Sequence, residues 1–231
     1  MKINWKSDQE LFKLLKKKLF SAVLGDIMDQ QGYMHQFLPP AIHPIHGEMI
    51  VAGRAMTVLE TDIFNEVSGS SGDNSLATPF GLMFNALDDL KENEVYICTG
   101  ASPSYALWGE LMSTRAIKLG AAGAVLHGYT RDSNGILALG FPTFSIGKYA
   151  QDQGPRGKVI DFRIEIEMEG VRIRPGDIVF GDIDGVCIIP RQIEEDVIHL
   201  ALEKVDGENR VRKALEAGMS AGEAFEKFEI M

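Results

Sequence analysis

The chain has few cysteines and no long apolar run. Cys98 and Cys187 are its two cysteines, and both lie in strand-like apolar runs without the CxxC spacing of many metal and redox sites. This pattern favours buried, reduced thiols over a disulfide framework. No segment approaches the ~20 consecutive apolar residues that cross a bilayer, and residues 1–6 lead into a charged helix rather than a signal peptide. We therefore expect a cytoplasmic protein without a membrane partner.

Positive charge is also scarce. The chain has 23 Lys and Arg against 33 Asp and Glu, for a formal net charge of −10. Nucleic-acid phosphates are bound by clustered Lys and Arg, so this balance argues against a nucleic-acid partner. The one basic run, Lys16–Lys18, is expected on the solvated face of the first helix. A small anionic substrate stays compatible with the acidity, because one arginine and a metal ion can dominate the local field.

The rest of the composition is that of an ordinary globular protein, with 45% hydrophobic and 24% charged residues. A chain of 231 residues can bury a full core, and we expect a single domain over residues 1–231. Ser-x-x-Glu patterns that begin at Ser7 and Ser220 predict capped helices near both ends. They indicate a helical lead-in over residues 1–32 and a helical tail over residues 191–231.

Apolar periodicity between the ends predicts a mixed α/β fold. The expected strands are 51–59, 94–99, 124–129, 142–146, 159–168, 171–173, 178–180 and 186–189. The expected helices are 80–90, 107–119 and 133–139. Because strands and helices alternate between residues 94 and 146, the strands in this part are predicted to pair in parallel. The polar stretch Ser68–Ser75 has the composition of a loop, which is expected to interrupt the fold without dividing it.

The most informative segment runs from Trp108 to Asp132. Its first apolar residues recur at helical spacing up to Gly120, which predicts a helix that opens near Gly109. A short apolar strand follows, and Arg131 and Asp132 come directly after it. Ligands of open α/β sheets bind at that edge. A helix N-terminus and an arginine would form a cradle for an anion there, and a carboxylate beside them can hold a divalent cation.

The same segment carries a resemblance. Twenty residues separate Glu110 from Arg131-Asp132, and this spacing resembles the signature of the RraA-like family. Further segments between Ser21 and Pro190 also resemble that family. They are Ser21–Met28, Leu38–Ile42, Val51–Val58, Gly140–Phe144, Arg174–Asp177 and Asp182–Val186. The resemblance implies an α/β fold of the β/β/α swivelling-type sandwich class with N- and C-terminal helices, assembled as a homotrimer or homohexamer with sites at subunit interfaces.

The resemblance also implies an activity. It points to a divalent-metal-dependent lyase that releases pyruvate from a 2-oxo acid, as a 4-hydroxy-4-methyl-2-oxoglutarate aldolase, an oxaloacetate decarboxylase or both. The family includes the regulator of ribonuclease activity, so the alternative is a non-catalytic regulator that binds a ribonuclease through an acidic surface. A Schiff-base aldolase would need a lysine on a strand of a βα barrel, and the predicted elements of this chain do not include eight βα units. A methyltransferase is not supported, because no Gly-rich loop follows an early strand.

Two carboxylates are assigned to the metal on the strength of the resemblance. Asp132 is expected to bind the cation, Mg²⁺ or Mn²⁺, because both ions prefer oxygen ligands. Glu110 is expected to reach the cation through a water; the family often carries Asp at this position. Each residue has a structural alternative. Asp132 could instead cap the helix that begins at Ser133, and Glu110 is favourable in any first helical turn.

The expected catalytic residues are Arg131, Asp132 and Glu110. The expected substrate-binding residues are Gly109, Glu110, Leu111, Met112 and Arg131. Arg131 would pair with the keto oxygen as that oxygen gains charge. The backbone N–H groups of Leu111 and Met112, in the helical turn that opens at Gly109, would bind the substrate carboxylate.

Other polar residues have simpler interpretations. His127 lies within an apolar strand and is predicted to be a core histidine with satisfied hydrogen bonds. Asp182 and Asp184 flank a turn between strands and are predicted to stabilise it. Lys158 and Glu208 are conceivable contributions from a neighbouring subunit, although no motif supports either.

Overall fold

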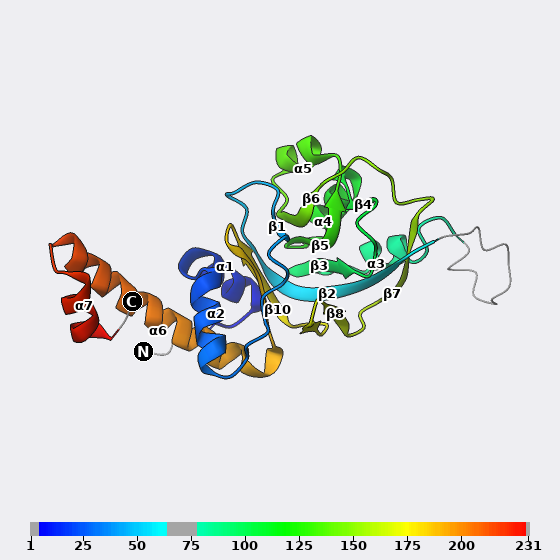
Figure 1. Cartoon of the computed structure of the whole chain (residues 1–231). Coiled ribbons are helices and arrows are strands. Elements are labelled where there is room, and N and C mark those ends of the chain that lie inside the picture. The colour runs from blue at the N-terminus through cyan, green and yellow to red at the C-terminus, as the bar shows by residue number, and fades with distance from the viewer. Residues whose placement is uncertain (1–4, 64–77, 230–231) are drawn as a thin grey trace.

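Helices occupy both ends of the chain, and a large sheet forms between them (Figure 1). The computed structural model describes residues 5–63 and 78–229, so the predicted loop Ser68–Ser75 lies outside the described residues. The helices are α1 (Asp8–Lys18), α2 (Ser21–Gln30), α3 (Met83–Asp88), α4 (Glu110–Leu119), α5 (Ser133–Leu139), a 3-10 turn (Arg191–Ile193), α6 (Glu194–Glu216) and α7 (Ala221–Phe228). The strands are β1 (His43–Pro44), β2 (Val51–Asp62), β3 (Glu94–Thr99), β4 (Ala106–Trp108), β5 (Gly123–Thr130), β6 (Thr143–Lys148), β7 (Gly157–Phe162), β8 (Ile166–Met168), β9 (Val171–Ile173), β10 (Ile178–Asp182) and β11 (Gly185–Ile189).

The main sheet combines parallel and antiparallel strands. Its order is β1-β6-β5-β3-β2-β10-β11, with β4 added beside β5 and β7 beside β2. The strands β2, β3, β5 and β6 pair in parallel, as their alternation with helices predicts, whereas β10 pairs with β2 in antiparallel register. The mixed α/β class is therefore confirmed. The carboxyl ends of β2, β3 and β5 consequently lie along one edge of the sheet.

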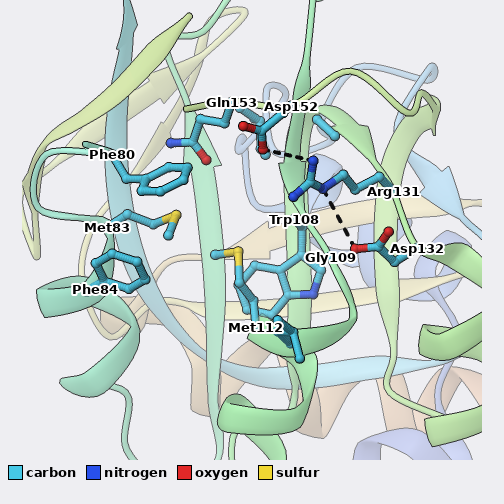
Figure 2. Close-up of a pocket in the computed structure, with 13 residues that line it drawn as sticks. Phe80, Met83, Phe84, Trp108, Gly109, Met112, Arg131, Asp132, Asp152 and Gln153 are labelled. Carbon is cyan, nitrogen blue, oxygen red and sulfur yellow. Dashed lines mark ion pairs between the residues drawn. The ribbon is translucent and has the colours of Figure 1, made fainter. Parts of the chain in front are cut away.

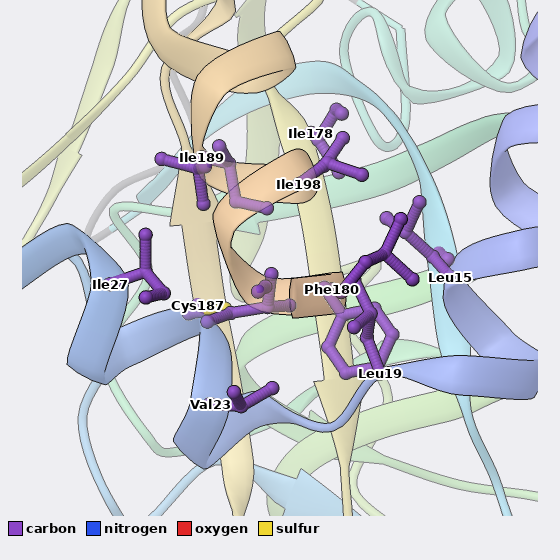
Figure 3. Packing of buried hydrophobic residues seen from close by; sticks show 14 of the residues in the cluster. Leu15, Leu19, Val23, Ile27, Ile178, Phe180, Cys187, Ile189 and Ile198 are labelled. Carbon is purple, nitrogen blue, oxygen red and sulfur yellow. The ribbon is translucent and has the colours of Figure 1, made fainter. Parts of the chain in front are cut away.

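The terminal helices pack on the antiparallel end of the sheet. Side chains of α1, α2 and α6 meet those of β10 and β11 in one apolar cluster (Figure 3). The residues labelled there are Leu15, Leu19, Val23, Ile27, Ile178, Phe180, Cys187, Ile189 and Ile198. Each fully buried Leu, Ile or Phe side chain contributes roughly 1.5–3 kcal/mol to folding. This packing anchors the start of α6, whose later turns extend away from the sheet together with α7 (Figure 1).

Both Ser-x-x-Glu patterns lie at the starts of helices, but only the pattern at α7 forms both hydrogen bonds of a capping box. Ser220 and Glu223 form the reciprocal pair at α7. At α1, Ser7 accepts a hydrogen bond from the N–H of Glu10 at 3.3 Å, while the Glu10 carboxylate accepts from the N–H of Lys6 at 2.8 Å. Within residues 5–63 and 78–229, no helix is both long enough and apolar enough to cross a membrane.

The helix predicted over residues 107–119 begins later than expected. Ala106–Trp108 form β4, and α4 starts at Glu110. Trp108 is fully buried, and its indole N–H donates to the hydroxyl of Ser113 at 2.7 Å. Apolar residues before a helix fit either a buried strand or a first helical turn, so periodicity alone does not separate the two.

The strand predicted over residues 159–168 is divided at Arg163. This residue has a φ of 57°, which turns the chain between β7 and β8. Its guanidinium binds Glu94 at 2.8 Å and also Asp89. The expected helix 80–90 is likewise shortened to α3, because Phe80 has a φ of 68° and its backbone is not helical.

Candidate active site at the edge of the parallel strands

The two ends of the Trp108–Asp132 segment meet at one sheet edge. The carbonyl of Trp108 accepts from the N–H of Arg131 at 2.9 Å and from the hydroxyl of Thr130 at 3.1 Å. These bonds tie the end of β4 to the end of β5, which run in parallel. Gly109 and Asp132 therefore leave the sheet side by side, as expected from their positions in the sequence.

Gly109 allows this close approach. A Cβ atom on Gly109 would lie 2.7 Å from Oδ2 of Asp132, so a larger residue here would push the Asp132 carboxylate out of this position. Gly109 also precedes α4, where the N–H of Ser113 bonds back to its carbonyl at 3.1 Å. The N–H groups of Leu111 and Met112 come before this first intrahelical bond, so they have no partner within the helix. They are positioned to bind an anion, assisted by the helix dipole.

The Asp132 carboxylate is not a helix cap. Asp132 occupies the position before α5, but its side chain makes no capping hydrogen bond. The backbone carbonyl takes that role and accepts from the N–H groups of Gly135 and Ile136. The half-exposed carboxylate lies 3.7 Å from Nε of Arg131. It therefore keeps lone pairs for a cation or a substrate.

Arg131 is held by a residue that the sequence did not indicate. Its Nη1 lies 2.8 Å from Oδ1 of Asp152, and Oδ2 of Asp152 accepts from the N–H of Gly154 at 3.1 Å. Asp152 stands in the loop after β6, twenty-one positions beyond Arg131. An isolated aspartate in a polar loop has no local signal of this contact.

A pocket of about 220 Å³ opens beside these groups (Figure 2). Its polar side is formed by Gly109, Arg131, Asp132, Asp152 and Gln153. The remaining lining residues are apolar and come from α3, α4, β4 and the turn before α3. They are Phe80, Met83, Phe84, Ala106, Leu107, Trp108, Leu111 and Met112.

Glu110 does not line this pocket. Its carboxylate rests against α5, where a Cβ atom on Gly135 would lie 2.2 Å from Oε2 of Glu110. The side chain of Leu111 is 82% exposed, so its expected contribution is limited to the backbone N–H. Neither Lys158 on β7 nor Glu208 on α6 lines the pocket of this chain.

The carboxylate at this edge suits a cation that is bound by oxygen atoms and partly open to solvent. The described residues contain no group of three or more His, Cys, Asp or Glu side chains placed to hold a metal. Asp132 nevertheless offers a half-exposed carboxylate without a capping role. Mg²⁺ is commonly held by one or two carboxylates and completed by waters and substrate oxygens. The residues present fit that mode, whereas a closed zinc site would need more side-chain ligands.

The other polar residues have structural partners. His127 is partly buried rather than enclosed in the core, and its ring nitrogens lie 3.1 Å from Thr99 Oγ1 and 3.1 Å from Glu169 Oε1. Asp182 accepts from the N–H and hydroxyl of Ser21, both at 2.7 Å, and from the N–H of Asp184 at 3.0 Å. Asp182 therefore stabilises the β10–β11 turn as predicted, and it also fixes the start of α2.

Glu60, at the same sheet edge, is a buried acid. It is 2% exposed, and the thiol of Cys98 lies 3.8 Å from its Oε2. Its Oε1 has no hydrogen-bond partner among the described residues. Burial raises the pKa of Glu60 from 4.5 to about 8, so the folded protein holds this carboxyl in its neutral form at pH 7.

We expect Glu60→Gln to stabilise the protein at alkaline pH. The folded state keeps the Glu60 proton up to about pH 8, whereas the unfolded chain loses it near pH 4.5. The wild type therefore loses stability as the pH rises through this window, by up to about 5 kcal/mol. An amide does not ionise in this pH range, so the variant does not lose stability in this way. Urea unfolding at pH 5 and pH 9 should show the gain only at pH 9, and the exposed Glu226→Gln should show none. Parallel pH profiles for the Glu60 variant and the wild type would contradict this.

Known proteins resemble the chain over most of its length. Residues 21–188 match the family model described as "RraA-like: Aldolase/RraA". A relative from Halalkalibacterium halodurans named "Putative 4-hydroxy-4-methyl-2-oxoglutarate aldolase" is 33% identical over 177 residues, which cover 76% of this chain and 77% of the relative. Protein DlpA from Legionella pneumophila is 26% identical over 209 residues, which cover 90% of this chain and 32% of DlpA. The chain thus spans about a third of the length of DlpA.

A solved structure confirms the fold. Streptomyces coelicolor RraAS2, described as "an unusual member of the RNase ES inhibitor RraA protein family", superposes with a TM-score of 0.74 at 20% sequence identity. The match covers 90% of this chain and 99% of that one.

Proposed function

The chain belongs to the RraA-like family, and from that membership we propose that it is a carbon–carbon lyase that releases pyruvate from a 2-oxo acid. The observation that carries the proposal is the pocket in which Arg131 and Asp132 meet the free first-turn N–H groups of α4. Relatives that bear the name of a 4-hydroxy-4-methyl-2-oxoglutarate aldolase support a lyase activity.

The pocket offers a donor for each oxygen of a 2-oxo acid. The substrate carboxylate would accept from the N–H groups of Leu111 and Met112. The keto oxygen would face Arg131, which Asp152 holds in place at 2.8 Å. A divalent cation on Asp132, Mg²⁺ or Mn²⁺, would supply a second positive charge toward that oxygen.

This arrangement would stabilise charge where aldol cleavage creates it. The C3–C4 bond breaks, its electron pair passes into the enolate of pyruvate, and the C4 hydroxyl loses a proton to become a carbonyl. Protonation at C3 then gives pyruvate. Loss of carbon dioxide from a carboxylate β to the keto group leaves the same enolate, so one site would serve oxaloacetate as well. Arg131 favours the charged enolate over the neutral ketone, which lowers the barrier.

A coupled pyruvate assay tests the proposal. Oxaloacetate and 4-hydroxy-4-methyl-2-oxoglutarate are supplied with Mg²⁺, with Mn²⁺ or with EDTA, and the enzyme-free rate is subtracted because oxaloacetate decarboxylates spontaneously. Cation-stimulated pyruvate release that EDTA abolishes would support the lyase. Absence of release from both substrates would overturn it and leave the ribonuclease-binding regulator as the alternative.

We also propose a domain organisation, a cellular location and an oligomeric state. Residues 1–231 would act as one domain in the cytoplasm, where the buried thiols of Cys98 and Cys187 stay reduced. The chain would assemble as a homotrimer or homohexamer, with neighbouring subunits completing the site. Support comes from the α6–α7 arm, which extends from the sheet (Figure 1) and presents Leu200, Leu215 and Phe225 to solvent. Light scattering of the purified chain would identify a monomer, trimer or hexamer.

Glu110→Gln should be a mild variant. Because the Glu110 carboxylate rests on α5 outside the pocket lining, it would reach the cation only through water. Changes at such outer positions cost about 10–100-fold in metal affinity or activity, and we expect a reduction of kcat at the lower end of that range with the same cation requirement. The coupled assay measures it, with the exposed Glu226→Gln as the control. A loss as complete as that of an Asp132 variant would instead indicate direct coordination or proton transfer by Glu110.

A further inference from the structure

A second cavity adjoins the candidate site. Its volume is about 280 Å³, and its lining comes from the carboxyl ends of β5 and β6, the residues that follow them and the start of α5. Arg131 and Asp132 line both cavities, and Lys148 lines the second one. A substrate held by Arg131 and a cation on Asp132 can therefore extend into either cavity.

Strand pairing places Lys148 beside the candidate site. The strands β5 and β6 run in parallel, with Thr130 and Lys148 in register at their ends. The carbonyl of Thr130 accepts from the N–H of Tyr149 at 2.9 Å, and Arg131 is the next residue after Thr130. Neighbouring strands lie about 4.8 Å apart, so Lys148 leaves the sheet close to Arg131. Because this pairing is internal to the chain, it would be kept in an assembly of subunits.

Lys148 is a cation without a carboxylate partner in this chain. Arg131 lies close to two carboxylates, at 2.8 Å from Asp152 and 3.7 Å from Asp132. Lys148, by contrast, is exposed and forms no ion pair with any of the described residues. Its ammonium can therefore bind a carboxylate of a ligand without first breaking an internal ion pair.

The charge at this edge of the sheet favours a substrate with two carboxylates. Among the residues that line the two cavities, the cations Arg131 and Lys148 balance the carboxylates Asp132 and Asp152. A divalent cation on Asp132 would add two positive charges, which belong in any account of the local field. A substrate with one carboxylate would leave one of these charges unmatched, whereas a substrate with two carboxylates would balance both.

We propose that Lys148 binds the carboxylate that a substrate carries on C4. The first carboxylate and the keto oxygen stay with the N–H groups of α4 and with Arg131, and C4 points into the second cavity. This inference rests on the proposed lyase function and makes Lys148 a specificity-determining residue. Aldol cleavage leaves the C4 carboxylate unchanged on the carbonyl product, so Lys148 binds it equally in the substrate and in the transition state. Its contribution should therefore appear in KM and not in kcat.

Two pyruvate adducts that differ only at C4 provide the test. The adduct of pyruvate with glyoxylate bears a carboxylate on the hydroxylated C4, and the adduct with acetaldehyde bears a methyl group. We expect kcat/KM for pyruvate release by the wild type to be at least about tenfold higher for the carboxylate adduct. Equal values, or a preference for the methyl adduct, would overturn the inference while leaving the lyase proposal intact. Absence of pyruvate from both adducts and from oxaloacetate would instead overturn the lyase proposal, and the inference with it.

Lys148→Met should remove this preference without affecting the reaction itself. Methionine keeps an unbranched side chain but lacks the charge, so we expect KM for the carboxylate adduct to rise about tenfold at an unchanged kcat. Both constants for the methyl adduct should stay as in the wild type. Lys118→Met, at an exposed position of α4 outside both cavity linings, is the matched control and should change neither adduct. An equal loss for both adducts in Lys148→Met would show that Lys148 does not act on the C4 carboxylate.

Light scattering of the same variants separates substrate binding from a role of Lys148 in assembly. Because the ammonium is assigned to the substrate, we expect Lys148→Met to keep the oligomeric state of the wild type. Lys148→Arg retains the charge and should also retain the preference for the carboxylate adduct. Dissociation of the assembly in Lys148→Met, with a loss of activity toward both adducts, would assign Lys148 to a subunit interface and overturn the inference.

Discussion

Replacing Asp132 with Asn is expected to abolish cation-stimulated pyruvate release while leaving the fold intact. Asp132 has a φ of 55°, a conformation that Asn tolerates better than Ala, so the amide variant avoids the backbone strain of an alanine. The carboxylate makes no capping bond, so α5 should keep its N-terminus. Without the charge the cation would bind weakly, and several kcal/mol of enolate stabilisation would be lost, which corresponds to a rate loss on the order of 10³.

Metal binding gives a second measure of the same variant. Mn²⁺ can replace Mg²⁺ at oxygen-ligand sites and is detected by electron paramagnetic resonance. We expect Mn²⁺ affinity to fall at least about tenfold in Asp132→Asn and to stay unchanged in Asp206→Asn, an exposed position on α6. A variant that retains wild-type Mn²⁺ binding and Mg²⁺-dependent turnover would show that Asp132 is not the metal ligand.

The proximity of Gly109 and Arg131 could be predicted from the sequence, because it follows from general rules on where strands and helices begin and end. A glycine before a helix and an arginine after a buried strand both lie at element ends, and parallel strands with helical crossovers place those ends on one edge. The structure brings them together through the bonds of Trp108 with Thr130 and Arg131. The same rules do not predict β4. Trp108 lies in a buried strand because it pairs with Thr130 of β5, which is distant in the sequence.

Asp152 and Gln153 could not be predicted from the sequence for a related reason. They stand in a polar loop whose residues would ordinarily be solvated. The position of Asp152 depends on the ion pair with Arg131, and that of Gln153 on burial against the pocket wall. Both arise only when β6 returns beside β5. The break at Arg163 is similar, because its positive φ is stabilised by the carboxylates of Asp89 and Glu94 on another part of the chain.

Arg131→Lys should lose most activity although it keeps the positive charge. The guanidinium of Arg131 binds Asp152 through Nη1 at 2.8 Å and lies 3.7 Å from Asp132 through Nε. Its planar fork can keep these contacts and still donate to the enolate oxygen, whereas an ammonium is a compact donor that cannot span them. Loss of one such donor costs ~3–4 kcal/mol, or on the order of 10²–10³ in rate. Because the enolate oxygen is charged mainly in the transition state, kcat should fall at least as much as KM rises.

Oxalate distinguishes this role of Arg131 from a structural one. It is a planar mimic of the pyruvate enolate, and we expect it to inhibit the wild type and to bind Arg131→Lys more weakly. Arg115→Lys is the matched control, because Arg115 pairs with Asp88 at 2.7 Å on the exposed side of α4 and lies outside the pocket lining. That control should retain both turnover and inhibition. If Arg131→Lys also retained near-normal turnover and oxalate inhibition, Arg131 would be removed from the mechanism. The enolate would then depend on the cation alone.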